Sequence, residues 1–155
     1  MGMGEPFLNY NNSIAAARLL NHTKGINLGA RRITISTAGI IGKIKKFTNE
    51  KHPFRLAVSL NGSNHDQRLK IMPITKNQTF QNLLKVIKAY TNQSRKRITI
   101  EYVLIEGINN SQKDSLKLIE ILSQIKCKLN VIPYNEIDSI YKRPTKEGIY
   151  VFLNP

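Results

Sequence analysis

The sequence is poor in cysteine and has no apolar run long enough to cross a membrane. Its one cysteine, Cys127, excludes an internal disulfide. Because no stretch has the length of a membrane span or the layout of a signal peptide, we expect a cytoplasmic protein with no membrane partner. The histidines His22, His52 and His65 lack the spacing of a metal-binding pair on one helix or strand, so each is expected to be a surface residue.

Acidic residues are scarce beside basic ones. The chain has 24 Lys and Arg against 10 Asp and Glu, which gives a formal net charge of +14. This excess suits a polyanionic partner better than an acidic protein or a neutral metabolite, so nucleic acid is the natural candidate. A lysine-rich composition with solvated side chains explains the same count. Both explanations also apply to the local basic cluster formed by Arg31, Arg32, Lys43, Lys45 and Lys46.

At 155 residues and 41% hydrophobic content, the chain is long enough for one globular domain. Apolar, β-branched runs predict strands at residues 32–36, 54–60, 97–104 and 128–133. Helical spacing of apolar residues predicts helices at 13–21, 40–49, 79–92 and 111–125, and Ser111 with Asp114 forms a capping-box pattern. Residues 61–77 and 135–155 lack either pattern and are predicted to be loops over a ligand site and a frayed end.

Alternation of strand and helix demands parallel strands joined by right-handed crossovers, so the predicted class is α/β. Periodicity does not choose between an open sheet and a barrel. In both architectures ligand groups gather just beyond the carboxyl ends of the strands. The residues at these ends have polar or charged side chains, which is typical of a ligand-binding mouth: Glu5, Ser36, Thr37, Ser59, Asn61 and Asn135.

The first six residues, MGMGEP, place two glycines and a carboxylate in one short loop. Gly2 and Gly4 let the backbone approach a ligand closely, Glu5 accepts a hydrogen bond from an ammonium group, and Pro6 stiffens the exit. An ordinary turn has a similar composition. We interpret the run as the exit of a buried strand, and we expect that strand to be missing from the chain.

Five segments, in this order, resemble the RlmN-type dual-specificity RNA methyltransferases, a branch of the radical S-adenosylmethionine enzymes. They are MGMGEPFLNYNN (1–12), RRITISTAG (31–39), LAVSLN (56–61), TIEYVL (99–104) and CKLNVIPYN (127–135). The resemblance extends from Met1 to about Pro144. It implies a partial radical-SAM (β/α)6 TIM-like barrel, in which this chain holds about the last four strands.

The resemblance also implies an activity: methylation of carbon 2 of adenine in large-subunit rRNA and in tRNA, which are the implied partners. The implied cofactor is S-adenosyl-L-methionine, with a 4Fe-4S cluster in full-length members. The cluster and catalytic cysteines of that family have no counterpart in this sequence. We therefore expect a fragment truncated at both ends and inactive alone, forming a single partial core domain over 1–155 with a degenerate tail at 136–155.

The family's cofactor contacts map onto the strand ends of this sequence. Asn61 stands where family members often have His, and Glu136 replaces the usual proline. By resemblance, Gly4 and Glu5 would hold the methionyl amino group, Ser36 and the segment Ser59, Leu60 and Asn61 would meet the carboxylate and ribose, and Asn135 would lie by the adenosine.

For two further residues, Glu101 and Cys127, we predict structural roles. Glu101 is predicted to be a buried or rim acid paired with Arg95 or Arg97, because no second carboxylate stands beside it for acid–base work. Cys127 is predicted to be a small buried thiol.

Other functions stay open. The chain is alternatively a basic RNA-binding module that has lost catalysis, or a non-radical methyltransferase using the same cofactor, although it has no glycine-rich nucleotide loop. The origin of the chain also stays open. It is a degraded gene product, an incompletely read coding sequence, or one part of a split gene whose N-terminal part is carried by a separate chain.

Overall fold

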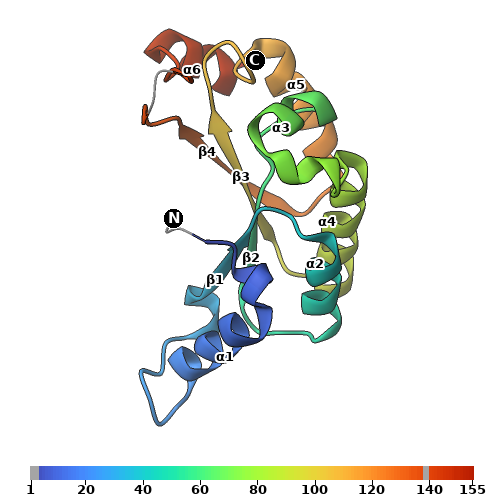
Figure 1. The fold of residues 1–155 in the computed structure, drawn as a ribbon, viewed down its shortest axis with the longest axis vertical. Coiled ribbons are helices and arrows are strands. Elements are labelled where there is room, and N and C mark those ends of the chain that lie inside the picture. Colours follow the sequence, from blue (N-terminus) through green and yellow to red (C-terminus); the bar gives the residue numbers. More distant parts are fainter. Residues whose placement is uncertain (1–3, 138–139) are drawn as a thin grey trace.

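A single parallel sheet organises the computed structural model, which describes residues 4–137 and 140–155. Its strand order, β1-β2-β3-β4, follows the chain order (Figure 1). Each connection therefore moves one step across the sheet in the same direction. The predicted strands and their parallel pairing are confirmed, with bounds β1 Thr34–Thr37, β2 Arg55–Ser59, β3 Ile98–Leu104 and β4 Cys127–Pro133.

The predicted helices are also confirmed, as α1 Tyr10–Asn21, α2 Ile41–Asn49, α4 Phe80–Ser94 and α5 Gln112–Ser123. The capping box at the start of α5 is present, because the Ser111 hydroxyl accepts from the Asp114 N–H and the Ser111 N–H donates to the Asp114 carboxylate. Short 3-10 helices complete these elements: η1 Pro6–Asn9, η2 Ala30–Arg32 and η3 Pro73–Lys76.

Two segments predicted to be irregular contain helices. Helix α3, His65–Ile71, and η3 occupy most of residues 61–77, and α6, Lys146–Leu153, lies in the expected frayed end. Phe152 of α6 is buried and stacks on Tyr102 of β3, with ring centroids 5.4 Å apart. The Ser115 hydroxyl of α5 donates to the Phe152 carbonyl at 2.6 Å. Sequence periodicity missed α6 because packing against α5 and β3, rather than a long apolar stripe, stabilises this short helix.

The two faces of the sheet differ in chemistry. Helices α2, α4 and α5 cover one face of the sheet (Figure 1). Leu56, Val58 and Ile100 share one face of the sheet by their register, and each is fully buried. The opposite face has Ser36, Ser59 and Glu101 at alternate strand positions. Helices on one face only, with strands in chain order, are the arrangement of a barrel wall, whereas doubly wound sheets are covered on both faces. The structure therefore shows a partial barrel with a polar inner face.

The core on the helix side includes His52, which was predicted to lie on the surface. Its exposed fraction is 5%, and its ring stacks on Phe54 with centroids 6.1 Å apart. Nε2 of His52 lies 2.6 Å from a carboxylate oxygen of Glu50, which also accepts a hydrogen bond from the Tyr10 hydroxyl at 2.6 Å. The prediction was wrong because His52 lies in the turn into β2, where α1 and α2 close over the sheet.

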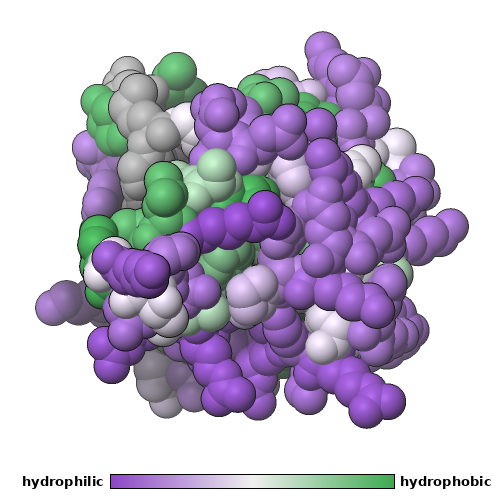
Figure 2. Space-filling view, turned by 90° about the horizontal axis from the view of Figure 1, so that it is seen from below, coloured by the Kyte–Doolittle hydropathy of each residue, from purple (hydrophilic) through white to green (hydrophobic). Residues whose placement is uncertain are grey.

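One face of the molecule is largely polar. Hydrophilic side chains dominate the face seen from below, and hydrophobic ones gather on one side of it (Figure 2). Within the described residues, no helix is both long enough and apolar enough to cross a membrane.

Candidate functional site

An open cavity of about 640 Å³ runs along the edge strand β1, between this strand and α1, and reaches the polar face of the sheet at Ser59 and Glu101. This volume falls within the range of small-molecule sites. Ala17 and Leu20 of α1 form part of its wall. Its polar lining comes from residues far apart in the sequence: Glu5, Ser36, Thr37, Ser59 and Glu101.

Glu5 is fixed in place by two backbone N–H groups. Its Oε1 accepts from Phe7 at 2.9 Å and its Oε2 accepts from Ala38 at 2.5 Å. A carboxylate has about four acceptor positions, so positions remain for a ligand. Gly4, which also lines the cavity, has a φ of 95°, a conformation that disfavours any side chain. Of the loop that sequence reasoning singled out, Gly4, Glu5 and Pro6 are therefore part of the cavity wall, and Gly2 lies outside the described residues.

Ser36, Ser59 and Glu101 meet on neighbouring strands. The register places Ser59 beside Glu101, and the hydroxyls of Ser36 and Ser59 donate to Oε2 of Glu101 at 3.2 and 3.4 Å. Glu101 is only 7% exposed. The acidic side chain of β3 thus faces the same cavity as the two predicted serines.

The predicted ion pair of Glu101 with Arg95 or Arg97 is wrong. The ion pairs found among the described residues join Glu50 to Lys46 and to His52. Arg97 shares a face of the strand with Glu101 but lies four residues away, which is about 13 Å along a strand. Glu101 is a site residue that sequence reasoning missed, and its signal was an acid between apolar neighbours in a central strand.

Arg68 of α3 holds the ends of β1 and β2 together. Its Nη1 donates to the carbonyls of Ser59 and Leu60 at 2.7 and 2.9 Å, and its Nη2 donates to the Ala38 carbonyl at 2.5 Å. Burial lowers the pKa of Arg68 to about 10. Gly39 has a φ of 106°, and a Cβ there would lie 3.0 Å from Nη2 of Arg68. Sequence reasoning missed Arg68 because its segment was predicted to be a loop.

The other predicted cofactor residues do not line this cavity. Leu60 is fully buried, and its N–H donates to the Glu101 carbonyl at 2.8 Å. Asn61 is buried with a φ of 54°, and its Oδ1 accepts from the Val103 N–H at 2.9 Å. Asn135 is exposed and accepts from Arg143 at 3.0 Å. The structure therefore brings together Gly4, Glu5, Ser36 and Ser59, but not Leu60, Asn61 or Asn135.

Asp114 ties α5 to the segment around Arg68. Its Oδ1 accepts from the Ser63 hydroxyl at 2.9 Å and from the Gln67 amide at 2.6 Å, and its Oδ2 accepts from the Ser111 hydroxyl at 2.6 Å. Burial alone would raise the pKa of Asp114, but the hydrogen bonds from Ser111, Gln67 and Ser63 outweigh this effect and lower the pKa.

The predicted basic cluster is split. Lys43 and Lys46 lie over the ring of Tyr10, with their nitrogens 5.6 and 4.7 Å from its centroid. Arg31 instead lines a separate cavity of about 450 Å³, near the amino-terminal ends of the strands. The residues described as lining this cavity include no acid, and its cations are Arg31, Arg55, Lys96, Arg97 and Lys128.

The residues described here do not fit an iron–sulfur cluster. They contain no group of three His, Cys, Asp or Glu side chains placed to hold a metal ion. Cys127 is half-buried at the start of β4, and burial raises the pKa of its thiol, which disfavours the thiolate that binds iron. The S-adenosylmethionine contacts are a better match, because the cavity offers a carboxylate with free acceptor positions and two hydroxyls.

A parallel half-barrel with polar side chains near the carboxyl ends of its strands defines an α/β-barrel fold, in which ligand groups gather at those ends. Residues 1–119 match the family described as the Radical SAM superfamily. The chain belongs to the radical SAM superfamily.

Named relatives narrow the resemblance. The chain is 44% identical over 154 residues to a Petrotoga mobilis protein named "Probable dual-specificity RNA methyltransferase RlmN", covering 99% of this chain and 44% of the relative. A Leptospira interrogans protein of the same name is 42% identical over 153 residues, covering 99% of this chain and 43% of the relative. The chain thus spans less than half the length of these relatives.

Solved structures agree with the fold. A crystal structure of a radical SAM methyltransferase from Sphaerobacter thermophilus matches with a TM-score of 0.94 and 37% identity, covering 99% of this chain and 46% of that one. A domain of pyruvate-formate lyase-activating enzyme from Bacteroides vulgatus matches with a TM-score of 0.69 and 16% identity, covering 99% of this chain and 91% of that one. At that identity the second match concerns the fold alone.

Proposed function

We propose that this chain binds S-adenosylmethionine in the cavity between β1 and α1, as part of an RNA methyltransferase of the RlmN type. The observation that carries this proposal is the convergence of Glu5, Ser36 and Ser59 on one cavity. The names of the relatives support the reaction class, because they are called dual-specificity RNA methyltransferases.

Each polar group has a distinct role in this proposal. Glu5 accepts a hydrogen bond from the ammonium group of the methionyl part, using acceptor positions that Phe7 and Ala38 leave free. Ser36 and Ser59 meet the carboxylate and ribose, for which their hydroxyls turn away from Glu101 toward the ligand. Beside a reduced 4Fe-4S cluster, S-adenosylmethionine supplies radical and methyl-transfer chemistry. This chain has one cysteine and cannot ligate such a cluster through cysteine alone, so we propose that it is inactive by itself.

The proposed substrate is an adenine in large-subunit rRNA and in tRNA, methylated at carbon 2. The net charge of +14 favours a polyanion of this kind. A cytoplasmic location fits these partners. Leu60, Asn61 and Asn135 were also predicted to contact the cofactor. We keep these contacts as part of the proposal for a longer protein, in which further residues complete the cofactor site.

Titration with S-adenosylmethionine tests the proposal. Amide chemical-shift changes in NMR spectra detect dissociation constants in the millimolar range, so a weakly binding chain remains measurable. We expect shifts at Ser36, Ala38 and Ser59, and a loss of affinity of about 10-fold in Glu5→Gln, since a hydrogen bond to a charged group is removed. Glu120→Gln, an exposed acid on α5, is the matched control and should bind as the unchanged chain does.

The absence of shifts at these amides at any cofactor concentration would overturn the proposal. If the chain then still bound RNA, the basic RNA-binding module without catalysis would be the better description, since the charge of +14 supports RNA binding without any cofactor.

A further inference from the structure

The cavity at the amino-terminal ends of the strands gathers positive charge without an acid to balance it. Its volume is about 450 Å³, and the described residues that line it include five cations but no Asp or Glu. Lys96 is half-buried, and its Nζ already donates to the His52 carbonyl at 2.5 Å. The other cations are exposed and belong to none of the ion pairs among the described residues: Arg31, Arg55, Arg97 and Lys128.

Three of these exposed cations come from neighbouring strands and share one face of the sheet. The register pairs Ala57 with Thr99, and Thr99 with Lys128. Arg55 and Arg97 lie two residues before Ala57 and Thr99, so the same register sets the two arginines side by side. Like charges directly opposite each other repel, and an anion bound between them would relieve this repulsion. Because neighbouring strands lie about 4.8 Å apart, the three cations extend over about 10 Å.

This arrangement favours the phosphates of a nucleic acid strand. Two guanidinium groups side by side can each make bidentate hydrogen bonds to phosphate oxygens. A row of cations across three strands fits an anion that repeats its charge along a chain better than it fits a single anion. The described lining contains no aromatic ring on which a base could stack, so the backbone alone would be recognised.

We infer that consecutive phosphates of a single-stranded RNA segment bind across the amino-terminal ends of β2, β3 and β4, through Arg55, Arg97 and Lys128. The inference rests on the proposed function for the identity of the partner, because the relatives are named RNA methyltransferases. The site itself is separate from the cofactor cavity. Arg55 and Ser59 are four residues apart on β2, which is about 13 Å along a strand. The chain therefore holds RNA without sequence preference, at a distance from the proposed cofactor contacts.

The test titrates an unstructured oligouridylate into the unchanged chain and into a double variant, Arg55→Gln with Arg97→Gln, at about 50 mM salt. The matched control, Lys113→Gln with Lys117→Gln, removes the same two charges from exposed positions on α5. We expect the cavity variant to bind about 10-fold more weakly or worse, because two charge-assisted contacts are lost, and the control to change by less than about twofold. Amide chemical shifts of the unchanged chain should move at Arg55 and Arg97, but not at Lys113.

A second double variant separates geometry from charge. Arg55→Lys with Arg97→Lys keeps both charges but loses the planar forks, so we expect an intermediate loss of about threefold. Both cavity variants change exposed side chains and keep the backbone hydrogen bond from the Arg55 N–H to the Ile33 carbonyl, and their thermal unfolding should match that of the unchanged chain.

Two results would overturn the inference. Equal losses in the glutamine variant and in the α5 control would show a diffuse attraction without a site. Stronger binding of polyglutamate than of RNA with the same number of charges, at the same amides, would assign the cavity to an acidic protein segment. The proposed function is read separately, from shifts at Ser36 and Ser59 on titration with S-adenosylmethionine. If those shifts are absent while the RNA discrimination persists, the proposed cofactor site fails and the RNA site stands.

Discussion

Glu5 accepts a hydrogen bond from the backbone N–H of Ala38 at 2.5 Å, which joins the first described loop to the end of β1 across 33 residues. The loop is also held by Phe7, which is fully buried and packs on Phe47 with ring centroids 5.9 Å apart. One side chain therefore both closes the structure and faces the cavity. Replacing Glu5 should change local stability as well as cofactor binding.

Glu5→Gln should loosen the end of β1. The variant keeps the shape of the side chain but loses its charge, so the bond to Ala38 weakens and the free energy of unfolding falls by about 1 kcal/mol. Hydrogen exchange at the Ala38 amide should accelerate, whereas the Ile100 amide in the central strand should change only with global stability. Unchanged exchange at Ala38 would show that the bond does not hold the loop.

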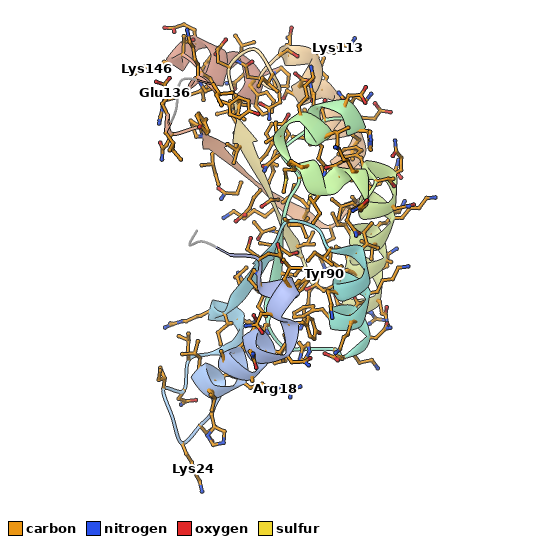
Figure 3. All side chains as sticks on the ribbon, viewed as in Figure 1. Arg18, Lys24, Tyr90, Lys113, Glu136 and Lys146 are labelled. Carbon is orange, nitrogen blue, oxygen red and sulfur yellow. The ribbon has the colours of Figure 1, made fainter. Side chains whose placement is uncertain are left out.

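Arg68→Met should destabilise the fold strongly. The variant leaves the carbonyls of Ala38, Ser59 and Leu60 without their buried donor, and we expect a loss of about 3 kcal/mol or more in urea unfolding. Arg18→Met is the matched control, because Arg18 lies on the exposed surface of α1 (Figure 3). Its effect should stay within about 0.5 kcal/mol. Equal losses in the two variants would contradict the role given to Arg68.

Asp114 should make stability depend on acid pH. Its pKa is lowered from 3.8 in the folded state, so its contribution is present above that value and is lost as pH falls through the lower folded pKa. Asp114→Asn should reduce stability at pH 7 by about 1 to 3 kcal/mol and should flatten the stability curve below about pH 4. Thermal unfolding across that range, compared with exposed Asp66→Asn, measures this difference. Parallel curves for the Asp114 variant and the unchanged chain would refute it.

RNA binding should be mainly electrostatic. Affinity for an unstructured RNA should fall steeply between about 50 and 200 mM salt. Removing Arg55 and Lys128 together should lower the slope of log affinity against log salt by about 1.4, if both contact phosphates of a single strand. The control removes Lys113 and Lys117 from α5. In Figure 3 the control residue Lys113 is labelled at one end of the molecule, and Lys24 is labelled at the opposite end. Identical slopes in the two double variants would exclude a special role for the cavity cations.

Iron–sulfur reconstitution should fail for this chain alone. With one cysteine, it lacks the thiolates that hold a 4Fe-4S cluster. Anaerobic incubation with iron and sulfide should give no stoichiometric cluster absorbance and no 5′-deoxyadenosine from S-adenosylmethionine. A cluster that formed, and disappeared in Cys127→Ser, would contradict this expectation.

The sequence by itself determined the α/β class, the strands, four of the helices and the capping box at Ser111. These features depend on local patterns: β-branched runs, helical spacing of apolar residues, and side chains that satisfy nearby backbone groups. The sequence also placed polar residues at the strand ends, of which Glu5, Ser36 and Ser59 lie around one cavity, and the resemblance to a known family added their roles as cofactor contacts. The sequence left open whether the strands form an open sheet or a barrel.

Only the tertiary structure decided that question, together with the places of Glu101, Arg68 and His52. Helices cover one face of the sheet, so the other face became a polar inner wall on which Glu101 meets two serines. Arg68 became buried because it donates to the Ala38 carbonyl from a distant segment, and His52 became buried because the ring of Tyr10 in α1 packs near it. Local sequence patterns do not reveal these contacts, because the partners are far apart in the chain. Arg68 and Ala38 are 30 residues apart, and Ser36 and Glu101 are 65 residues apart.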